Sequence, residues 1–140
     1  MAFEIHTEIS IQASPEKVWN ILTDFPRIHT WNPFIKSITG DVAEGKQIKV
    51  ALGGMKFTPI VLDYKPAKEF RWLGQVLFKG LFDGAHRFHL EGLADGTTLF
   101  RHSEKFTGML VPVFKKKLLE ETKANFEAFN QGLKKEAEKV

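Results

Sequence analysis

Apolar and polar side chains alternate strictly at the start of the chain. The positions on the more apolar side are Phe3, Ile5, Thr7, Ile9 and Ile11. A period of two predicts a half-buried strand over residues 3–11. Ser14-Pro15-Glu16 then supplies an N-cap, a first-turn proline and an early carboxylate, which together predict a helix start. A second short helical segment is expected around Arg27–His29.

Six further strands are predicted from alternating segments that turn residues separate. They are Phe34–Thr39, Lys46–Leu52, Met55–Tyr64, Glu69–Leu77, Phe82–Leu93 and Thr97–Phe106. Gly53-Gly54 predicts a two-residue hairpin between the second and third of them. Because the connections are short and no helical periodicity intervenes, we expect an antiparallel meander, with the opening strand at an edge of the sheet.

The last part of the chain has a helical period. From Pro112 onward, apolar or small side chains recur every three or four residues, at Phe114, Leu118, Thr122, Phe126, Phe129, Leu133 and Ala137. This spacing predicts one helix of about 25 residues, roughly 38 Å long, with a single apolar face. A helix of that kind needs a sheet to lie across. Gly132 costs such a helix about 1 kcal/mol relative to alanine, which suggests the close approach of a strand, loop or ligand.

Composition narrows the class of protein. The 140 residues suit a single domain, 1–140, and 43% hydrophobic with 26% charged residues is typical of globular chains. A net charge of +3 gives no reason to expect a nucleic-acid partner. The absence of cysteine excludes disulfides, thiolate zinc sites and a cysteine nucleophile. No secretory signal and no long apolar run is seen, so we expect a cytoplasmic protein without stable membrane insertion, as a monomer or weak homodimer.

The register of the last two predicted strands follows from burial. Even-numbered positions carry the apolar side chains in both strands. A two-residue turn at 95–96 would set the two apolar rows on opposite faces of the sheet. A three-residue loop, 94–96, with Gly96 in a left-handed conformation, brings the rows to the same face. In that register His86 lies opposite Glu104.

The same register places Phe88 opposite His102. His86, His102 and Glu104 then lie together on an otherwise apolar face, toward the closing helix. A carboxylate in such a place is costly unless it is paired or hydrogen-bonded. The cluster is therefore either a satisfied internal network that makes the sheet rigid, or a polar group that orients a ligand in an aromatic pocket. Two histidines and a carboxylate also form the ligand set of non-haem iron oxygenases, but no other motif supports a metal, and we expect neither metal nor cofactor.

Several segments in this order resemble the helix-grip fold of the SRPBCC superfamily, which includes START, Bet v 1-like and polyketide cyclase/dehydrase-like proteins. They are Ala13-Ser14-Pro15-Glu16-Lys17-Val18-Trp19, Trp31-Asn32-Pro33-Phe34, Gly96-Thr97-Thr98, Phe106-Thr107-Gly108 and the long closing helix. The resemblance covers essentially the whole chain. It implies an α+β fold, β-α-α-β6-α, in which a curved seven-stranded antiparallel sheet grips the C-terminal helix around an apolar cavity.

A hydrophobic small molecule is the expected ligand of such a cavity, of the lipid, polyketide or aromatic kind. The residues expected to bind it are Trp31, Phe70, Trp72, His86, Phe88, Phe100, His102, Glu104, Phe126, Phe129 and Leu133. One alternative is a cofactor-independent cyclase, dehydratase or isomerase with His86 and Glu104 as acid and base. Another is a protein-interaction module. The Lys115–Lys117 run is either a solvated face or a contact for anionic lipid.

Overall fold

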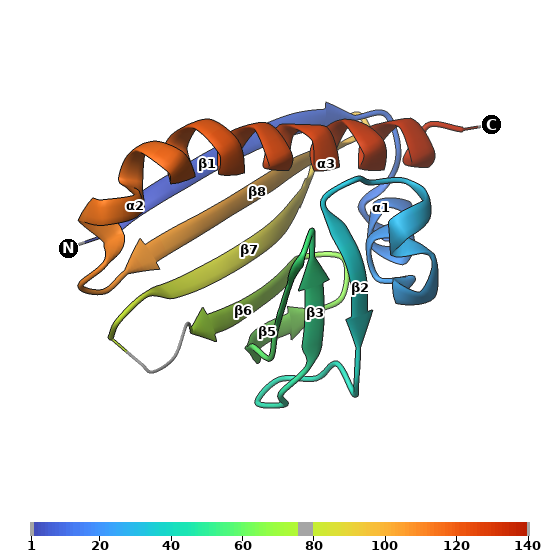
Figure 1. The fold of residues 1–140 in the computed structure, drawn as a ribbon. Coiled ribbons are helices and arrows are strands. Elements are labelled where there is room, and N and C mark those ends of the chain that lie inside the picture. Colours follow the sequence, from blue (N-terminus) through green and yellow to red (C-terminus); the bar gives the residue numbers. More distant parts are fainter. Residues whose placement is uncertain (1, 76–79, 140) are drawn as a thin grey trace.

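The fold is a curved antiparallel sheet whose concave face is covered by a long C-terminal helix and a second, smaller sheet (Figure 1). It is known from a computed structural model that describes residues 2–75 and 80–139. The main sheet has five strands in the order β1-β8-β7-β6-β5. They are β1 (Ala2–Ile11), β5 (Ile60–Lys65), β6 (Glu69–Gln75), β7 (Asp83–Gly92) and β8 (Thr98–Thr107).

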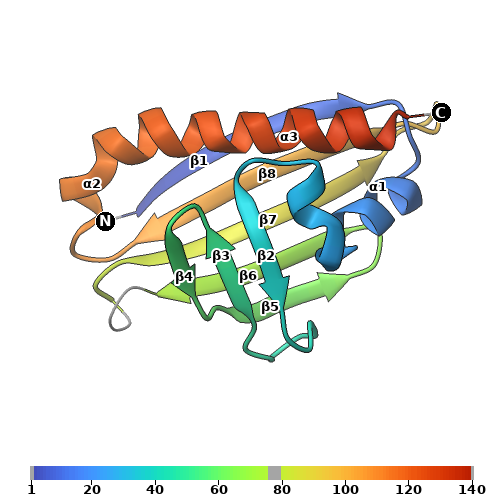
Figure 2. The ribbon, with the colours of Figure 1, turned by 45° about the vertical axis from the view of Figure 1, so that its right-hand side comes forward.

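A three-stranded sheet, in the order β2-β3-β4, crosses over the concave side of the main sheet near β6 and β7 (Figure 2). Its strands are β2 (Ile35–Thr39), β3 (Lys49–Leu52) and β4 (Met55–Phe57). The helix α1 (Pro15–Leu22) and the 3₁₀ helix η1 (Phe25–Thr30) connect β1 to this second sheet. As predicted, Ser14 caps α1: its hydroxyl accepts a hydrogen bond from the Lys17 backbone N–H at 3.2 Å.

The prediction of one seven-stranded sheet was wrong. In the part of the chain that the structure describes, eight strands form two sheets, because the expected Met55–Tyr64 strand breaks between β4 and β5. Pro59 lies in the break and has no N–H to donate to a strand ladder. Backbone hydrogen bonds around an isolated bridge between Gln47 and Ile60 join the two sheets. The end of the predicted Glu69–Leu77 strand, residues 76 and 77, lies outside the described residues.

The predicted register of the last two strands is confirmed. His86 pairs with Glu104 and Phe88 pairs with His102. The connecting loop is residues 94–96, since the backbone N–H of Leu93 donates to the carbonyl of Thr97 at 2.9 Å. Gly96 has φ +86°, the left-handed conformation that this loop requires. β1 pairs with β8 along its whole length and forms an edge of the sheet, as expected.

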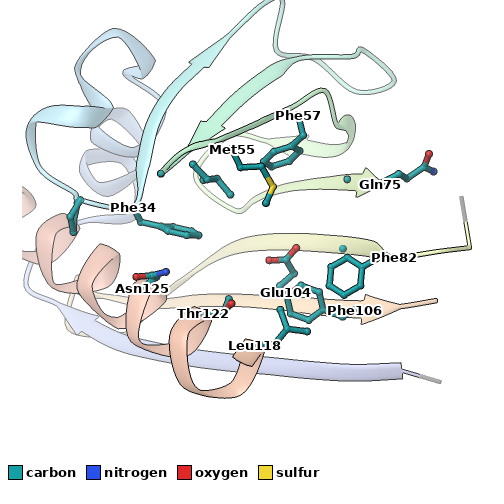
Figure 3. A pocket seen from close by; sticks show the side chains of 15 residues that line it. Phe34, Met55, Phe57, Gln75, Phe82, Glu104, Phe106, Leu118, Thr122 and Asn125 are labelled. Atoms are coloured by element: carbon teal, nitrogen blue, oxygen red, sulfur yellow. The ribbon is translucent and has the colours of Figure 1, made fainter. Parts of the chain in front are cut away.

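The closing helix runs without interruption from Val111 to Ala137 as α2 (Val111–Lys117), the π-helical turn η2 (Leu118–Thr122) and α3 (Lys123–Ala137). Three successive four-residue steps, from Phe114 to Phe126, would each drift about 40° around an ideal α-helix. The wider π turn takes up part of that drift. It contains Leu118, which packs against the core cluster that includes Phe106 of the main sheet, and Thr122 (Figure 3).

Gly132 lets the helix approach the loop before β2. A Cβ on Gly132 would collide with the backbone carbonyl oxygen of Trp31 and press on the carbonyl carbon of the same residue. The close approach expected from the sequence is therefore to a loop. Farther along the same helix, Phe126, Phe129 and Leu133 are fully buried against the main sheet.

Candidate functional site

A chain of buried polar side chains crosses the core between the helix and the main sheet. Asn130, on α3, contacts Thr7 of β1 at 2.8 Å and His102 of β8 at 2.9 Å. The Nε2 atoms of His102 and His86 are 2.7 Å apart, and His86 Nδ1 lies 3.2 Å from Glu104 Oε1. Thr7, Asn130, His102 and His86 are all buried, whereas the Glu104 side chain is 16% exposed. The chain therefore leads from the interior toward the surface and ends at a carboxylate.

The donor and acceptor of each hydrogen bond can be assigned by starting at Thr7, the inner end of the buried polar chain. The Thr7 hydroxyl donates to the backbone carbonyl of His102 at 2.7 Å, because a carbonyl can only accept. The Thr7 oxygen then accepts from the Asn130 Nδ2, so that the Asn130 Oδ1 accepts from the Nδ1–H of His102. A neutral His102 has one N–H, which leaves its Nε2 as an acceptor. His86 must therefore donate from Nε2.

His102 is held neutral by its surroundings. Burial, and next the charge of His86, lower the pKa of His102 well below 6.5, although hydrogen bonds to Asn130 and to the backbone of Phe126 act in the opposite direction. The ring is stacked on Phe126 with a centroid distance of 3.9 Å and has no exposed surface. A second proton on His102 would also point at the Nε2–H of His86. The geometry and the burial thus favour the same protonation state.

Glu104 lies over a glycine at the outer end of this chain. A Cβ on Gly84, on the neighbouring strand β7, would collide with Glu104 Oε2, so the carboxylate occupies space that any other residue would fill. The other oxygen, Oε1, faces His86. Oε1 therefore belongs to the internal chain, while Oε2 lies on the other side of the carboxylate.

Glu104 is also part of the wall of a pocket of about 370 Å³ (Figure 3). The pocket lies between the hairpin of β3 and β4, the end of the main sheet, and the π turn of the helix. Its lining is mostly apolar, with four polar side chains: Gln75, Glu104, Thr122 and Asn125. The remaining lining residues are Pro33, Phe34, Leu52, Gly53, Met55, Phe57, Gly74, Phe82, Gly84, Phe106 and Leu118.

Of the eleven residues expected to bind a ligand, Glu104 lines this pocket. Nine others fill the space between sheet and helix with close-packed side chains, each 1% exposed or less: Phe70, Trp72, His86, Phe88, Phe100, His102, Phe126, Phe129 and Leu133. Trp31 packs edge-on against Phe129 at 4.9 Å, and its indole N–H is buried with no partner among the described residues. The expected cavity position is thus occupied by an aromatic core.

Sequence reasoning did not identify the hairpin side of the pocket. Leu52, Met55 and Phe57 come from the segment around Gly53-Gly54, which the sequence marks as a turn. Their alternation predicted strands but gave no sign that the hairpin folds back over the main sheet. The exposed fraction of Met55, 57%, is consistent with a position at the pocket rim.

A second hollow of similar volume lies on the three-stranded sheet. It is lined by Ser37, Thr39, Lys49, Val50, Ala51, Lys56, Phe57 and Thr58. These side chains are mostly polar or solvated, and the buried polar chain does not reach them. The pocket beside Glu104 is therefore the better candidate for a binding site.

No group of three histidine, aspartate or glutamate side chains within residues 2–75 and 80–139 is arranged to hold a metal ion. His86, His102 and Glu104 instead use their facing atoms to bond one another. None of the described helices has the length and apolar character needed to cross a membrane. The side chains of Lys115, Lys116 and Lys117 are exposed, and the Lys115 ammonium lies 5.3 Å from the centre of the Phe3 ring.

The sequence pattern of the family described as "Polyketide cyclase / dehydrase and lipid transport" matches residues 2–138. The chain belongs to this family. The match confirms the resemblance to the SRPBCC superfamily that the sequence suggested. No curated protein matches the chain in sequence.

Solved structures share the fold of this family member at low sequence identity. A hypothetical protein of Helicobacter pylori has a TM-score of 0.81 at 14% identity, over 96% of this chain and 88% of its own. CalU16 of Micromonospora echinospora has a TM-score of 0.73 at 23% identity, over 98% and 75%. Norcoclaurine synthase of Thalictrum, in complex with a transition-state analogue, has a TM-score of 0.74 at 12% identity, over 98% and 94%. These similarities establish the fold alone.

Proposed function

We propose that this protein binds a hydrophobic small molecule, of the lipid, polyketide or aromatic kind, in the pocket beside Glu104. The observation that carries the proposal is the pocket itself, a concave volume of about 370 Å³ with a mostly apolar wall. That volume lies within the range of about 300–1,000 Å³ that small-molecule sites occupy. Family membership supports the same class of function, since the family is described by polyketide chemistry and lipid transport.

The apolar and the charged side chains of the pocket wall would play different parts in binding. Aromatic and aliphatic side chains from the hairpin, the sheet and the helix would be covered by the ligand, at about 25 cal/mol for each Å² of apolar surface removed from water. Phe34 and Phe106 supply aromatic parts of the wall, and Met55 lies at the hairpin. Glu104 is the one charged side chain in the lining. Apolar contact would thus supply affinity, and Glu104 would supply orientation.

Native mass spectrometry of the purified protein, followed by extraction of any bound compound, tests the proposal. A panel of fatty alcohols, polycyclic phenols and naphthalene derivatives is then measured by thermal shift and calorimetry. Thr122→Trp projects a large side chain into the pocket from the helix, and we expect it to weaken binding at least tenfold. Glu121→Trp is the matched control, because Glu121 is exposed and does not line the pocket.

The proposal is wrong if no compound of the panel binds the wild-type protein. It is also wrong if Thr122→Trp and Glu121→Trp bind equally well, since a ligand in the pocket must sense the first substitution and ignore the second. Circular dichroism of both variants confirms that they keep the fold.

A second candidate function is favoured by the short contact between His86 and Glu104. An imidazole and a carboxylate 3.2 Å apart at the wall of an apolar pocket are suited to proton transfer. A cofactor-independent cyclase, dehydratase or isomerase would use them as acid and base. Glu104→Gln distinguishes the two functions, because an enzyme would lose turnover of the bound compound while a binding protein would retain the compound.

A further inference from the structure

The buried polar chain determines how Glu104 faces the pocket. Its inner links have fixed directions, and they end with His86 donating from Nε2 to His102. His86 therefore has one ring nitrogen left, Nδ1, and that atom faces Glu104 Oε1 at 3.2 Å. The last link of the chain thus joins one nitrogen and one carboxylate oxygen, with room for one proton between them.

That proton can rest at either end of the link. If it rests on Nδ1, His86 is an imidazolium that donates to a carboxylate. If it rests on Oε1, Glu104 is a carboxylic acid that donates to a neutral imidazole. In both arrangements Oε2 carries no proton and is a hydrogen-bond acceptor.

A proton on Oε2 would require a less favourable state. The link to His86 would then need its own proton as well, and the pair would carry a net positive charge in a largely buried place. Such a charge, without a carboxylate to balance it, has a high desolvation cost. His86 is 1% exposed, so water does not relieve that cost.

The other polar groups of the pocket wall do not impose a polarity. Gln75 and Asn125 carry amides and Thr122 carries a hydroxyl, each of which can both donate and accept. The described lining contains no lysine, arginine or histidine. Glu104 Oε2 is therefore the group that sets the polarity, and it accepts.

We infer that the pocket selects apolar molecules that carry a hydrogen-bond donor, a hydroxyl or an amine, and rejects those that present only acceptors or a carboxylate. This inference rests on the proposed function, since it describes a ligand of the same pocket. A ligand whose polar group is an ether or a ketone leaves Oε2 dehydrated and unpaired. A ligand carboxylate also presents only acceptors to Oε2, and its charge loses its hydration in the apolar pocket. We expect each of these changes to weaken binding about tenfold or more.

Four naphthalene probes that share one ring system test the inference. 2-Naphthol and 2-(aminomethyl)naphthalene present donors, 2-methoxynaphthalene presents only an acceptor, and 2-naphthoate presents a carboxylate. Dissociation constants are measured by calorimetry on the wild-type protein at pH 7.5. The two donor probes should bind at least tenfold more tightly than the methyl ether, and naphthoate should bind most weakly.

Two substitutions of Glu104 distinguish the effect of its charge on ligand binding from the effect of its hydrogen-bond acceptor. In Glu104→Gln, the amide NH₂ can donate to Nδ1 of a neutral His86 and leave its oxygen toward the pocket, so the preference for naphthol over the methyl ether should remain. Glu104→Met has a similar shape but no acceptor, so this preference should vanish. The amine probe should lose affinity in both variants if it binds as a cation. Thermal unfolding shows whether each variant is folded, and the wild-type comparison of probes stands without them.

The outcomes separate the two proposals. Equal binding of naphthol and its methyl ether to the wild type, or tighter binding of naphthoate, would overturn the donor preference and leave the binding function intact. Failure of all four probes to bind would overturn the donor preference, and failure of the whole panel would refute the binding function as well. A preference for naphthol that persists in Glu104→Met would show that another group sets the polarity, and would also overturn the inference.

Discussion

Acid should destabilise this fold through His102. The folded state holds this side chain neutral, because burial lowers its pKa well below 6.5 and its Nε2 already accepts a hydrogen bond from His86. The unfolded chain has no such restraint and binds a proton at an ordinary pKa of about 6.5. As the pH falls below that value, the unfolded state gains a proton that the folded state does not, so the free energy of unfolding decreases.

The size of the effect follows from the linkage of protons to folding. A group that titrates only in the unfolded state lowers the free energy of unfolding by about 1.4 kcal/mol per pH unit below its unfolded pKa. Between pH 7.5 and pH 5.0 the loss amounts to about 2 kcal/mol, since the effect begins gradually near pH 6.5. The contribution is fully present above the unfolded pKa. A domain stabilised by about 5–15 kcal/mol would show this loss clearly.

Urea unfolding at pH 7.5, 6.5 and 5.0 measures the effect. The matched control is His102→Gln, because an amide has both a donor for Asn130 and an acceptor for His86 but does not titrate. Exposed histidines such as His6 and His29 are present in both proteins, so the difference between the two proteins isolates His102. The wild type should lose about 2 kcal/mol more than the variant over this range.

Parallel pH dependences in the two proteins would refute the reasoning. They would mean that the folded wild type accepts a proton on His102, and that the hydrogen-bond directions assigned to the buried chain are wrong. Nitrogen chemical shifts of His102 between pH 7.5 and 5.0 give an independent reading, and they should stay those of a neutral ring with the proton on Nδ1.

Three further substitutions test other parts of the structure by urea unfolding. Gly132→Ala should destabilise the fold by about 1–3 kcal/mol, because the new Cβ would press on the Trp31 carbonyl, and this outweighs the better helix propensity of alanine. The control is Gln131→Ala on the exposed side of the helix, which should change the free energy of unfolding by less than about 0.5 kcal/mol. Asn130→Leu should cost about 1–3 kcal/mol, since it removes the side-chain hydrogen bonds of Asn130 to the buried His102 and Thr7, and a stabilised variant would contradict this. Trp31→Phe removes an N–H that is buried without a partner among the described residues, so a loss above about 1 kcal/mol would show that the indole does more than pack.

The pairing of His86 with Glu104 could be predicted from the sequence because burial allows one register. Two apolar rows had to reach the same face, and only a three-residue loop satisfied that condition. The long helix could also be predicted from the sequence, because its helical period extends over many residues. Even the close approach at Gly132 had a local signal, a glycine in a helix that disfavours it.

The break between β4 and β5 was missed although its signal is present. Pro59 interrupts a segment that alternates on both sides: the alternation predicts one continuous strand, whereas the proline predicts a break. The consequence was larger than a shortened strand, because the break lets β4 leave the main sheet and places the hairpin over its concave face.

The position of the pocket could not be deduced from patterning. A phenylalanine in a packed core and one in a pocket wall occupy the same kind of position in an alternating strand. Phe88 and Phe106 both face the concave side, yet the first lies under the helix in the aromatic core and the second lines the pocket. Only the packing of the rings against one another determines which space stays open.

The break at Pro59 also separates two properties that a protein engineer would want to vary independently. The hairpin supplies four of the lining residues, Leu52, Gly53, Met55 and Phe57, whereas Glu104 and the histidines behind it belong to β7 and β8. Since the two sheets are joined around Gln47 and Ile60, the hairpin can change in side chains or length without disturbing the ladder of β7 and β8. A library randomised at residues 53–56, with Leu52 and Phe57 kept because they pack against the core, should therefore yield variants that accept ligands of different size, all with the same chemical group at the buried end.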